Sequence, residues 1–129
     1  MKGYDPYAQY KKTRVETASP AELITMLYDE AVKSLKLAVK AIEDKKPEIA
    51  HNNIIKVQDI LDELSFSINK EQGGEIAENL LSLYDYMKHQ LIEANLKKET
   101  TLVKEVCQMV EELRATWQEA AKAGTKSNG

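Results

Sequence analysis

The residues of this sequence that could take part in chemistry are two histidines, one cysteine and, through the backbone, a pair of adjacent glycines. Glu48 and His51 have the i, i+3 spacing that carboxylate-bridged di-iron bundles use. Such a site needs a second Glu-x-x-His pair, but the other histidine, His89, has Tyr86 three residues before it. A polar pair at a helix end is therefore a better interpretation than a metal site.

Nucleophilic and phosphate-binding chemistry are also poorly supported. Cys107 has no evident base beside it, which favours a structural thiol, and a lone cysteine excludes an internal disulfide and fits a reducing compartment. Gly73 and Gly74 lack the following Lys-Ser/Thr of a phosphate-binding loop. We therefore expect no catalytic residue, no metal and no cofactor, and hence a protein that is not an enzyme.

The composition indicates one helical domain. Hydrophobic residues make up 43% of the chain and charged residues 30%, with only five Gly and three Pro among 129 residues. A net charge of −3 gives no overall attraction to nucleic acid or to anionic lipid. The sequence shows neither a secretory signal nor an apolar run of the ~18–20 residues that a membrane span needs. These features predict a cytoplasmic protein.

The elements that must position any site begin at Ser19. Ser19 can cap the N–H of Glu22, and Pro20 suits the first helical position because it has no N–H to leave unpaired. Residues 1–18 precede this start and contain Pro6, so we expect a mobile segment with at most one short helical turn. Its means of anchoring are Tyr4, Tyr7 and Tyr10.

Four amphipathic segments follow, in which apolar residues recur at steps of three and four. Breaks are expected at residues 44–46, at Gly73–Gly74 and, less sharply, near Lys97–Lys98. Short connections between segments of similar length predict an all-α, antiparallel up-down four-helix bundle over residues 19–122, with a disordered tail at 123–129. The core stripes are Ile24, Tyr28, Ala31, Leu35, Ala38 and Ile42; Ala50, Ile54, Val57, Leu61, Leu64 and Ile68; Ile76, Leu80, Leu83, Met87, Leu91 and Ala94; and Val103, Val106, Val110, Leu113, Trp117 and Ala120.

A second set of apolar residues lies away from these stripes. Residues eleven apart share nearly one azimuth, because three helical turns take ~10.8 residues. The pairs with this spacing are Met26 and Leu37, Ile55 and Phe66, and Leu81 and Ile92. They are either singly exposed residues, or residues covered by the N-terminal segment, or a groove for an apolar partner. Tyr84 and Tyr86 flank the third core stripe, where we expect their hydroxyls to reach water.

Several separated segments, taken in order, extend over nearly the whole chain. They begin with Tyr7, Tyr10 and the run Thr17-Ala18-Ser19-Pro20. The others are Leu23, Met26-Leu27-Tyr28, Ile60-Leu61-Asp62-Glu63-Leu64, Asn79-Leu80-Leu81-Ser82-Leu83-Tyr84-Asp85-Tyr86-Met87, Leu91-Ile92-Glu93-Ala94-Asn95-Leu96-Lys97-Lys98 and Leu113-Arg114-Ala115-Thr116-Trp117. Together these segments resemble the flagellin export chaperones, the FliS family.

The resemblance implies a cytoplasmic chaperone that binds the C-terminal segment of newly made flagellin, prevents premature polymerisation and delivers it to the flagellar type III export gate. It also implies that the N-terminal segment can cover part of the binding surface when no client is bound. On this basis we expect partner contacts at Tyr7, Tyr10, Ile55, Phe66, Leu81 and Ile92. A helical adaptor with a different protein client would share every bundle feature, and a metal-bearing bundle enzyme is a further alternative that metal analysis would test.

Overall fold

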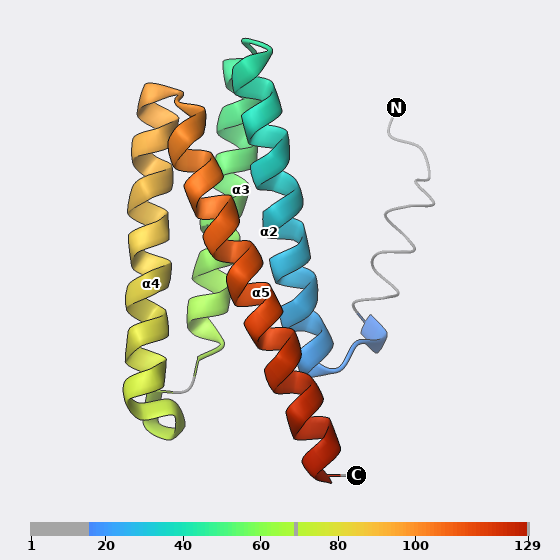
Figure 1. Ribbon diagram of the computed structural model, residues 1–129. Coiled ribbons are helices and arrows are strands. Elements are labelled where there is room, and N and C mark those ends of the chain that lie inside the picture. The colour runs from blue at the N-terminus through green and yellow to red at the C-terminus, as the bar shows by residue number, and fades with distance from the viewer. Residues whose placement is uncertain (1–15, 69, 129) are drawn as a thin grey trace.

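Four antiparallel helices make up most of the part of the chain that the structure describes (Figure 1): α2 (Pro20–Glu43), α3 (Pro47–Phe66), α4 (Lys70–Lys97) and α5 (Thr100–Asn128). This computed structural model describes residues 16–68 and 70–128, with the side chains of residues 70, 72 and 121–128 left out. Within these ranges the regular structure is all helical, which confirms the predicted four-helix fold. The described part of the chain contains no helix long and apolar enough to cross a membrane.

The helix ends follow local rules that the sequence shows. The Ser19 hydroxyl accepts a hydrogen bond from the Glu22 N–H at 3.2 Å, and Pro20 occupies the first turn of α2. Pro47 begins α3 in the same way. Helices α2 and α4 both end next to a lysine in the left-handed conformation, Lys45 with φ 58° and Lys98 with φ 53°. The helix end near Lys97–Lys98, which no Gly or Pro marks in the sequence, therefore coincides with the left-handed conformation of Lys98.

Two boundaries differ from those expected. The glycine pair lies inside the first part of α4, where Gly74 has φ 54° and ψ −129° and kinks the helix instead of ending it. Helix α5 continues to Asn128, past residue 122, where we expected the bundle to end. The predicted mobile segment falls almost entirely on residues 1–15, which lie outside the described residues.

The core consists mainly of the predicted stripes. Two residues depart clearly. Ile76 is 77% exposed, two residues after the kink at Gly74, and Ala120, near the end of the described side chains of α5, is also exposed. Trp117 was expected in the core and is only partly buried at its edge. The buried stripe residues are Tyr28, Ala31, Leu35 and Ala38 on α2, Ala50, Ile54, Val57, Leu61 and Leu64 on α3, Met87, Leu91 and Ala94 on α4, and Val103, Val106 and Val110 on α5.

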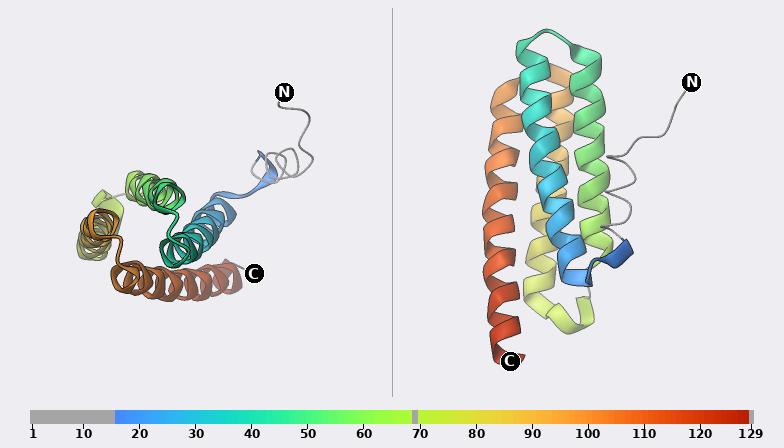
Figure 2. Two further views of the ribbon diagram at one scale, coloured as in Figure 1. Left: turned by 90° about the horizontal axis from the view of Figure 1, so that it is seen from above. Right: turned by 90° about the vertical axis from the view of Figure 1, so that its right-hand side faces the viewer.

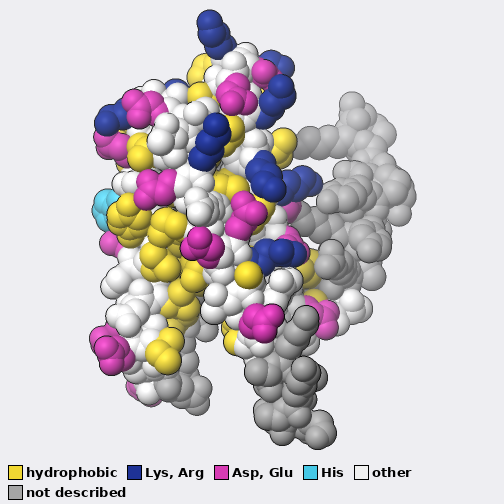
Figure 3. Space-filling model, in the orientation of Figure 1, with side chains coloured by type: hydrophobic (Ala, Val, Ile, Leu, Met, Phe, Trp, Pro, Cys, Tyr) yellow, Lys and Arg dark blue, Asp and Glu magenta, His cyan; other side chains and the backbone are white. Residues whose placement is uncertain are grey.

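Each helix packs against two neighbours, in the cyclic order α2, α3, α4, α5 (Figure 2). Helix α2 makes extensive contacts with both α3 and α5, whereas α4 makes fewer contacts with its two neighbours. On the face shown in Figure 3, hydrophobic side chains gather over α4 and the seam between α4 and α5. Helix α4 therefore leaves more of the apolar surface around it uncovered than α2 does.

Candidate functional site

Two polar links cross the outer seam between α3 and α4 and define how these helices are aligned. The Lys88 ammonium donates to the Asp62 carboxylate, and the Asn95 amide donates to Nδ1 of His51 at 2.8 Å. The residue numbers of the two linked pairs sum to 150 and 146. Because the helices are antiparallel, residues of α3 and α4 whose numbers sum to about 148 lie at nearly the same level. Ile55 therefore lies level with Ile92, and Phe66 with Leu81.

The side chains of these four residues share the seam with the polar links. Ile55 and Phe66 lie within about 60° of His51 and Asp62 around the axis of α3, and Leu81 and Ile92 lie within about 60° of Lys88 and Asn95 around that of α4. Polar links and apolar pairs alternate along the seam, in the order His51–Asn95, Ile55/Ile92, Asp62–Lys88 and Phe66/Leu81. We call this seam, comprising His51, Ile55, Asp62, Phe66, Leu81, Lys88, Ile92 and Asn95, the α3/α4 groove.

The exposure expected for the outward apolar residues is largely found. Phe66 is 90% exposed, Ile92 46% and Ile55 37%, while Leu81 is partly buried. Phe66 and Leu81 line one hollow of about 360 Å³ together with Asp62, Ser65, Asp85 and Lys88. The tertiary structure thus places Phe66 and Leu81 around one hollow, while Ile55 and Ile92 lie level with each other further along the same seam. Tyr7 and Tyr10, the other two residues of the predicted partner surface, lie outside the described residues.

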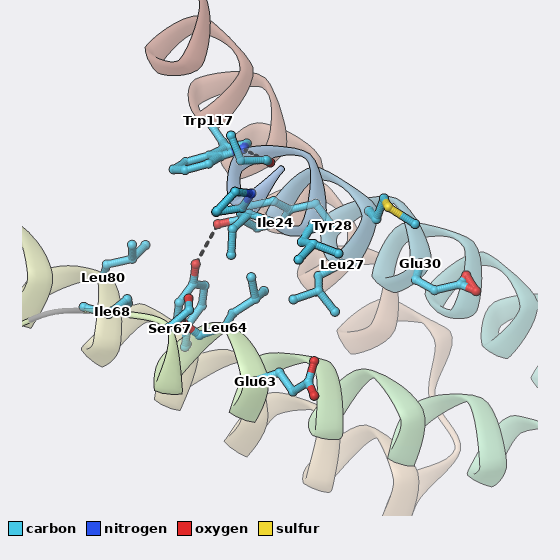
Figure 4. Close-up of a pocket in the computed structure, with 15 residues that line it drawn as sticks. Ile24, Leu27, Tyr28, Glu30, Glu63, Leu64, Ser67, Ile68, Leu80 and Trp117 are labelled. Carbon is cyan, nitrogen blue, oxygen red and sulfur yellow. Dashed lines mark hydrogen bonds between the residues drawn. The ribbon is translucent and has the colours of Figure 1, made fainter. Parts of the chain in front are cut away.

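A larger apolar cavity, of about 950 Å³, opens at the end of the bundle where α2 begins and α3 ends (Figure 4). We call it the end cavity. Its walls come from all four helices, with most of the lining residues on α2. The main lining residues are Leu23, Ile24, Met26, Leu27 and Tyr28 of α2, Leu64 of α3, Ser67 and Ile68 of the connection that follows it, Leu80 and Tyr84 of α4, and Trp117 of α5.

A pair of tyrosines supplies the polar centre of the end cavity. The hydroxyls of Tyr28 and Tyr84 lie 2.6 Å apart and bond to each other, although the two side chains are only 3% and 2% exposed. Burial raises the pKa of both phenols above the ordinary value, so both stay protonated at neutral pH. Tyr84 was expected to place its hydroxyl in water; this was wrong, because the ring turns inward to meet Tyr28 across the bundle.

The rim of the end cavity is held by Trp117. Its indole N–H lies 3.3 Å from the Ala21 carbonyl and 3.2 Å from the Thr25 hydroxyl, so it ties α5 to the first turns of α2. One turn away, the Arg114 guanidinium pairs with Asp29. These contacts support the part of α2 that directly follows the N-terminal segment.

The His51 and Cys107 side chains, which the sequence offered as candidates for metal binding or nucleophilic chemistry, have structural contacts instead. His51 accepts from Asn95, and the described residues contain no cluster of three or more His, Cys, Asp or Glu that could hold a metal ion. The Cys107 thiol is 7% exposed and lies 3.4 Å from a Glu111 carboxylate oxygen. Burial, and to a lesser extent the Glu111 carboxylate, raises the pKa of the thiol to about 11. The thiol is therefore a poor nucleophile at neutral pH.

Sequence reasoning missed the end cavity. Leu23 and Leu27 carried no signal, because they flank the α2 core stripe and resemble ordinary core-edge residues. Met26 was recognised as lying away from that stripe but could not be assigned to any hollow. A cavity depends on how far apart helices stand, and helical periodicity reports only which face of each helix is apolar.

Comparisons with known proteins agree over nearly the whole chain. A family model described as "Flagellar protein FliS" matches residues 3–124. The flagellar secretion chaperone FliS of Bacillus subtilis is 37% identical over 122 residues, which cover 95% of this chain and 90% of that protein. The protein of the same name from Salmonella typhimurium is 34% identical over 119 residues, covering 91% and 88%.

A solved structure described as a flagellar chaperone from bacteria has the same fold. It superposes with a TM-score of 0.75 and covers 92% of this chain and 99% of that one. At 16% sequence identity it supports the arrangement of helices alone.

Proposed function

This chain belongs to the FliS family, whose characterised members are flagellar secretion chaperones, and we propose that it holds the C-terminal segment of newly made flagellin in the cytoplasm. Holding that segment would keep flagellin from polymerising early and allow its delivery to the flagellar type III export gate. A binding function suits the described site, which offers apolar surface and no reactive group.

The observation that carries this proposal is the alternation of apolar pairs and polar links along the α3/α4 groove. Ile55 and Phe66 are eleven residues apart on α3, as are Leu81 and Ile92 on α4, which corresponds to ~16 Å along each axis. A client helix lying in the groove repeats its own apolar face at the same interval. It can therefore place one apolar side chain at each pair while a polar residue faces Lys88 and Asp62.

Burial of apolar surface is sufficient for such a chaperone. An amphipathic client segment that lacks its assembly partners exposes an apolar face, and the groove covers that face without any covalent change. Each well-buried aliphatic side chain contributes ~1.5–3 kcal/mol at most, and these residues are already partly covered. Binding by several modest contacts suits a client that must later be released.

Replacing Ile55 and Leu81 together by Gln tests the groove. We expect the double variant to bind the flagellin C-terminal segment at least ~10-fold more weakly in calorimetry, because one apolar contact is lost at each level. Its helical melt should match that of the unmodified chain, because neither side chain belongs to the buried core.

The matched control is Ile49→Gln, at a residue of α3 that is 48% exposed. Ile49 lies two turns before Lys56, which pairs with Glu30 of α2, so it is on the α2 side of the helix and outside the groove. Affinity that is unchanged in the double variant, or lowered equally by Ile49→Gln, would exclude this groove as the client site.

A further inference from the structure

We propose that the Tyr28–Tyr84 pair is a hydrogen-bond donor site that recognises a carbonyl oxygen of the flagellin segment when that segment's apolar side chains enter the end cavity. The inference rests on the proposed function and adds a second contact region, on the opposite side of α3 from the α3/α4 groove. The polar group of the client that binds there is a main-chain carbonyl.

The two hydroxyls of the pair carry more protons than their mutual hydrogen bond uses. Two phenol hydroxyls have two O–H protons between them, and their mutual hydrogen bond uses one. Within the described residues, the hydrogen bond found for these two hydroxyls is the one that they make with each other. Whichever tyrosine donates, the other keeps an O–H proton that has no acceptor in the described protein.

The surroundings of the pair define what can accept that proton. Both hydroxyls belong to residues that line the end cavity, and Figure 4 shows their bond among Ile24, Leu64 and Ser67. The other described residues that line the cavity are mostly apolar, apart from Glu30, Glu63 and Ser67, so an acceptor on a client would meet few competitors for that proton. Leaving a buried donor unpaired costs ~1–3 kcal/mol, so an incoming group that supplies an acceptor is favoured over one that is purely apolar.

A client segment of helical or partly helical form has such an acceptor. The last carbonyls of a helix lack partners within it, and the neighbouring side chains of an amphipathic segment are apolar. A segment ending in the end cavity would bury those side chains against Leu23, Leu27 and Leu80 and give one carbonyl to the tyrosine pair. A cavity of about 950 Å³ accommodates several side chains together with the main chain that bears them.

Phenylalanine substitutions test the donor count by calorimetry with the flagellin C-terminal segment. Tyr28→Phe and Tyr84→Phe each leave one O–H in the cavity, so each single variant should stay within about 3-fold of the unmodified affinity. The double variant retains the rings but has no donor, and we expect its affinity to fall ~10-fold. A loss confined to the double variant distinguishes a shared donor from two separate packing effects.

Tyr86→Phe is the matched control, because it removes a phenol hydroxyl two residues from Tyr84 that bonds Glu105 outside the cavity. A double variant whose affinity equals that of Tyr86→Phe would overturn the inference and leave the proposed function intact. Failure of the unmodified chain to bind flagellin would overturn both.

Hydroxyl-proton NMR of the unmodified chain gives an independent test that requires no folding of a variant. The inference predicts one exchange-protected hydroxyl proton from the Tyr28–Tyr84 pair in the free protein and two in the complex. One protected proton in both states would overturn it. Two protected protons already in the free protein would mean that the chain itself supplies the acceptor, and would overturn the assignment to the client.

Discussion

At the scale of single residues, Tyr84 and Tyr86 show how strongly environment decides a role. The two are separated by one residue on α4, yet Tyr84 is 2% exposed and bonds Tyr28, whereas Tyr86 is 46% exposed and bonds Glu105 of α5. A rotation of ~200° around the helix separates their side chains. The same residue type thus stabilises the bundle interior at one position and the α4/α5 surface at the other.

Cys107 provides a prediction with a defined pH dependence. Its thiol pKa is raised from 9.0 to about 11, chiefly by burial. At pH 8 the folded protein should react with a thiol reagent roughly 100-fold more slowly than the urea-unfolded chain, because two pKa units separate the thiolate fractions. Reaction at equal rates would show that the thiol is accessible in the folded state.

The same shift affects the free energy of unfolding. Because the folded pKa is the higher one, the contribution of the protonated thiol is fully present below pH 9 and is lost as the pH rises toward 11. The loss is at most about 2.7 kcal/mol. Urea unfolding of the unmodified chain and of Cys107→Ala at pH 8 and pH 10.5 measures the loss. The free energy of unfolding should fall less between these two pH values in the variant than in the unmodified chain.

At the scale of elements, the start of α2 and the kink of α4 have opposite effects. Ser19 and Pro20 give α2 a well-defined first turn, which carries the residues at the rim of the end cavity. In α4, the positive φ of Gly74 turns the first residues away from the packed part of the helix. One helix is thus fixed at its beginning, while the other leaves Ile76 exposed.

Ser19→Ala tests the contribution of the α2 cap. Loss of the hydroxyl leaves the Glu22 N–H without its acceptor, so the free energy of unfolding should fall by ~1 kcal/mol, with a decrease of a few degrees in melting temperature. Denaturant unfolding followed by circular dichroism measures the change. Ser82→Ala, at an exposed position within α4, is the control and should be neutral or slightly stabilising. Equal effects of the two substitutions would show that the cap contributes nothing.

At the scale of the whole molecule, the two apolar regions and the N-terminal segment have to be considered together. The described chain enters α2 at the rim of the end cavity, where Pro20 and Ala21 are lining residues. Tyr10 is ten residues before Pro20, so an extended chain could carry it as far as ~34 Å from that rim. The end cavity begins at that rim and is therefore within such a reach.

Deleting residues 1–10 tests whether the N-terminal segment competes with the client. If Tyr7 and Tyr10 cover part of the apolar surface in the free protein, their removal should tighten flagellin binding several-fold, because the competent state becomes more populated. Calorimetry with the flagellin C-terminal segment measures the effect. The full-length variant with Tyr7→Ser and Tyr10→Ser is the control that separates the tyrosines from chain length.

Weaker binding after the deletion would instead indicate that the segment contacts the client. An affinity that does not change in either direction would remove Tyr7 and Tyr10 from the mechanism.

The sequence by itself determined the helices, because their signals are local. Ser19, Pro20 and Pro47 mark helix starts through backbone hydrogen bonding within a few residues, and steps of three and four show which face of each helix must be buried. The same arithmetic found the outward residues Ile55, Phe66, Leu81 and Ile92.

Only the tertiary structure decided which of those faces meet. The pairing of Ile55 with Ile92 depends on the alignment of α3 with α4, and the Tyr28–Tyr84 bond joins residues 56 positions apart in the sequence. The end cavity depends on how closely four helices approach one another at one end of the bundle. Distances between helices arise from the packing of all their side chains at once, and no local pattern in the sequence contains them.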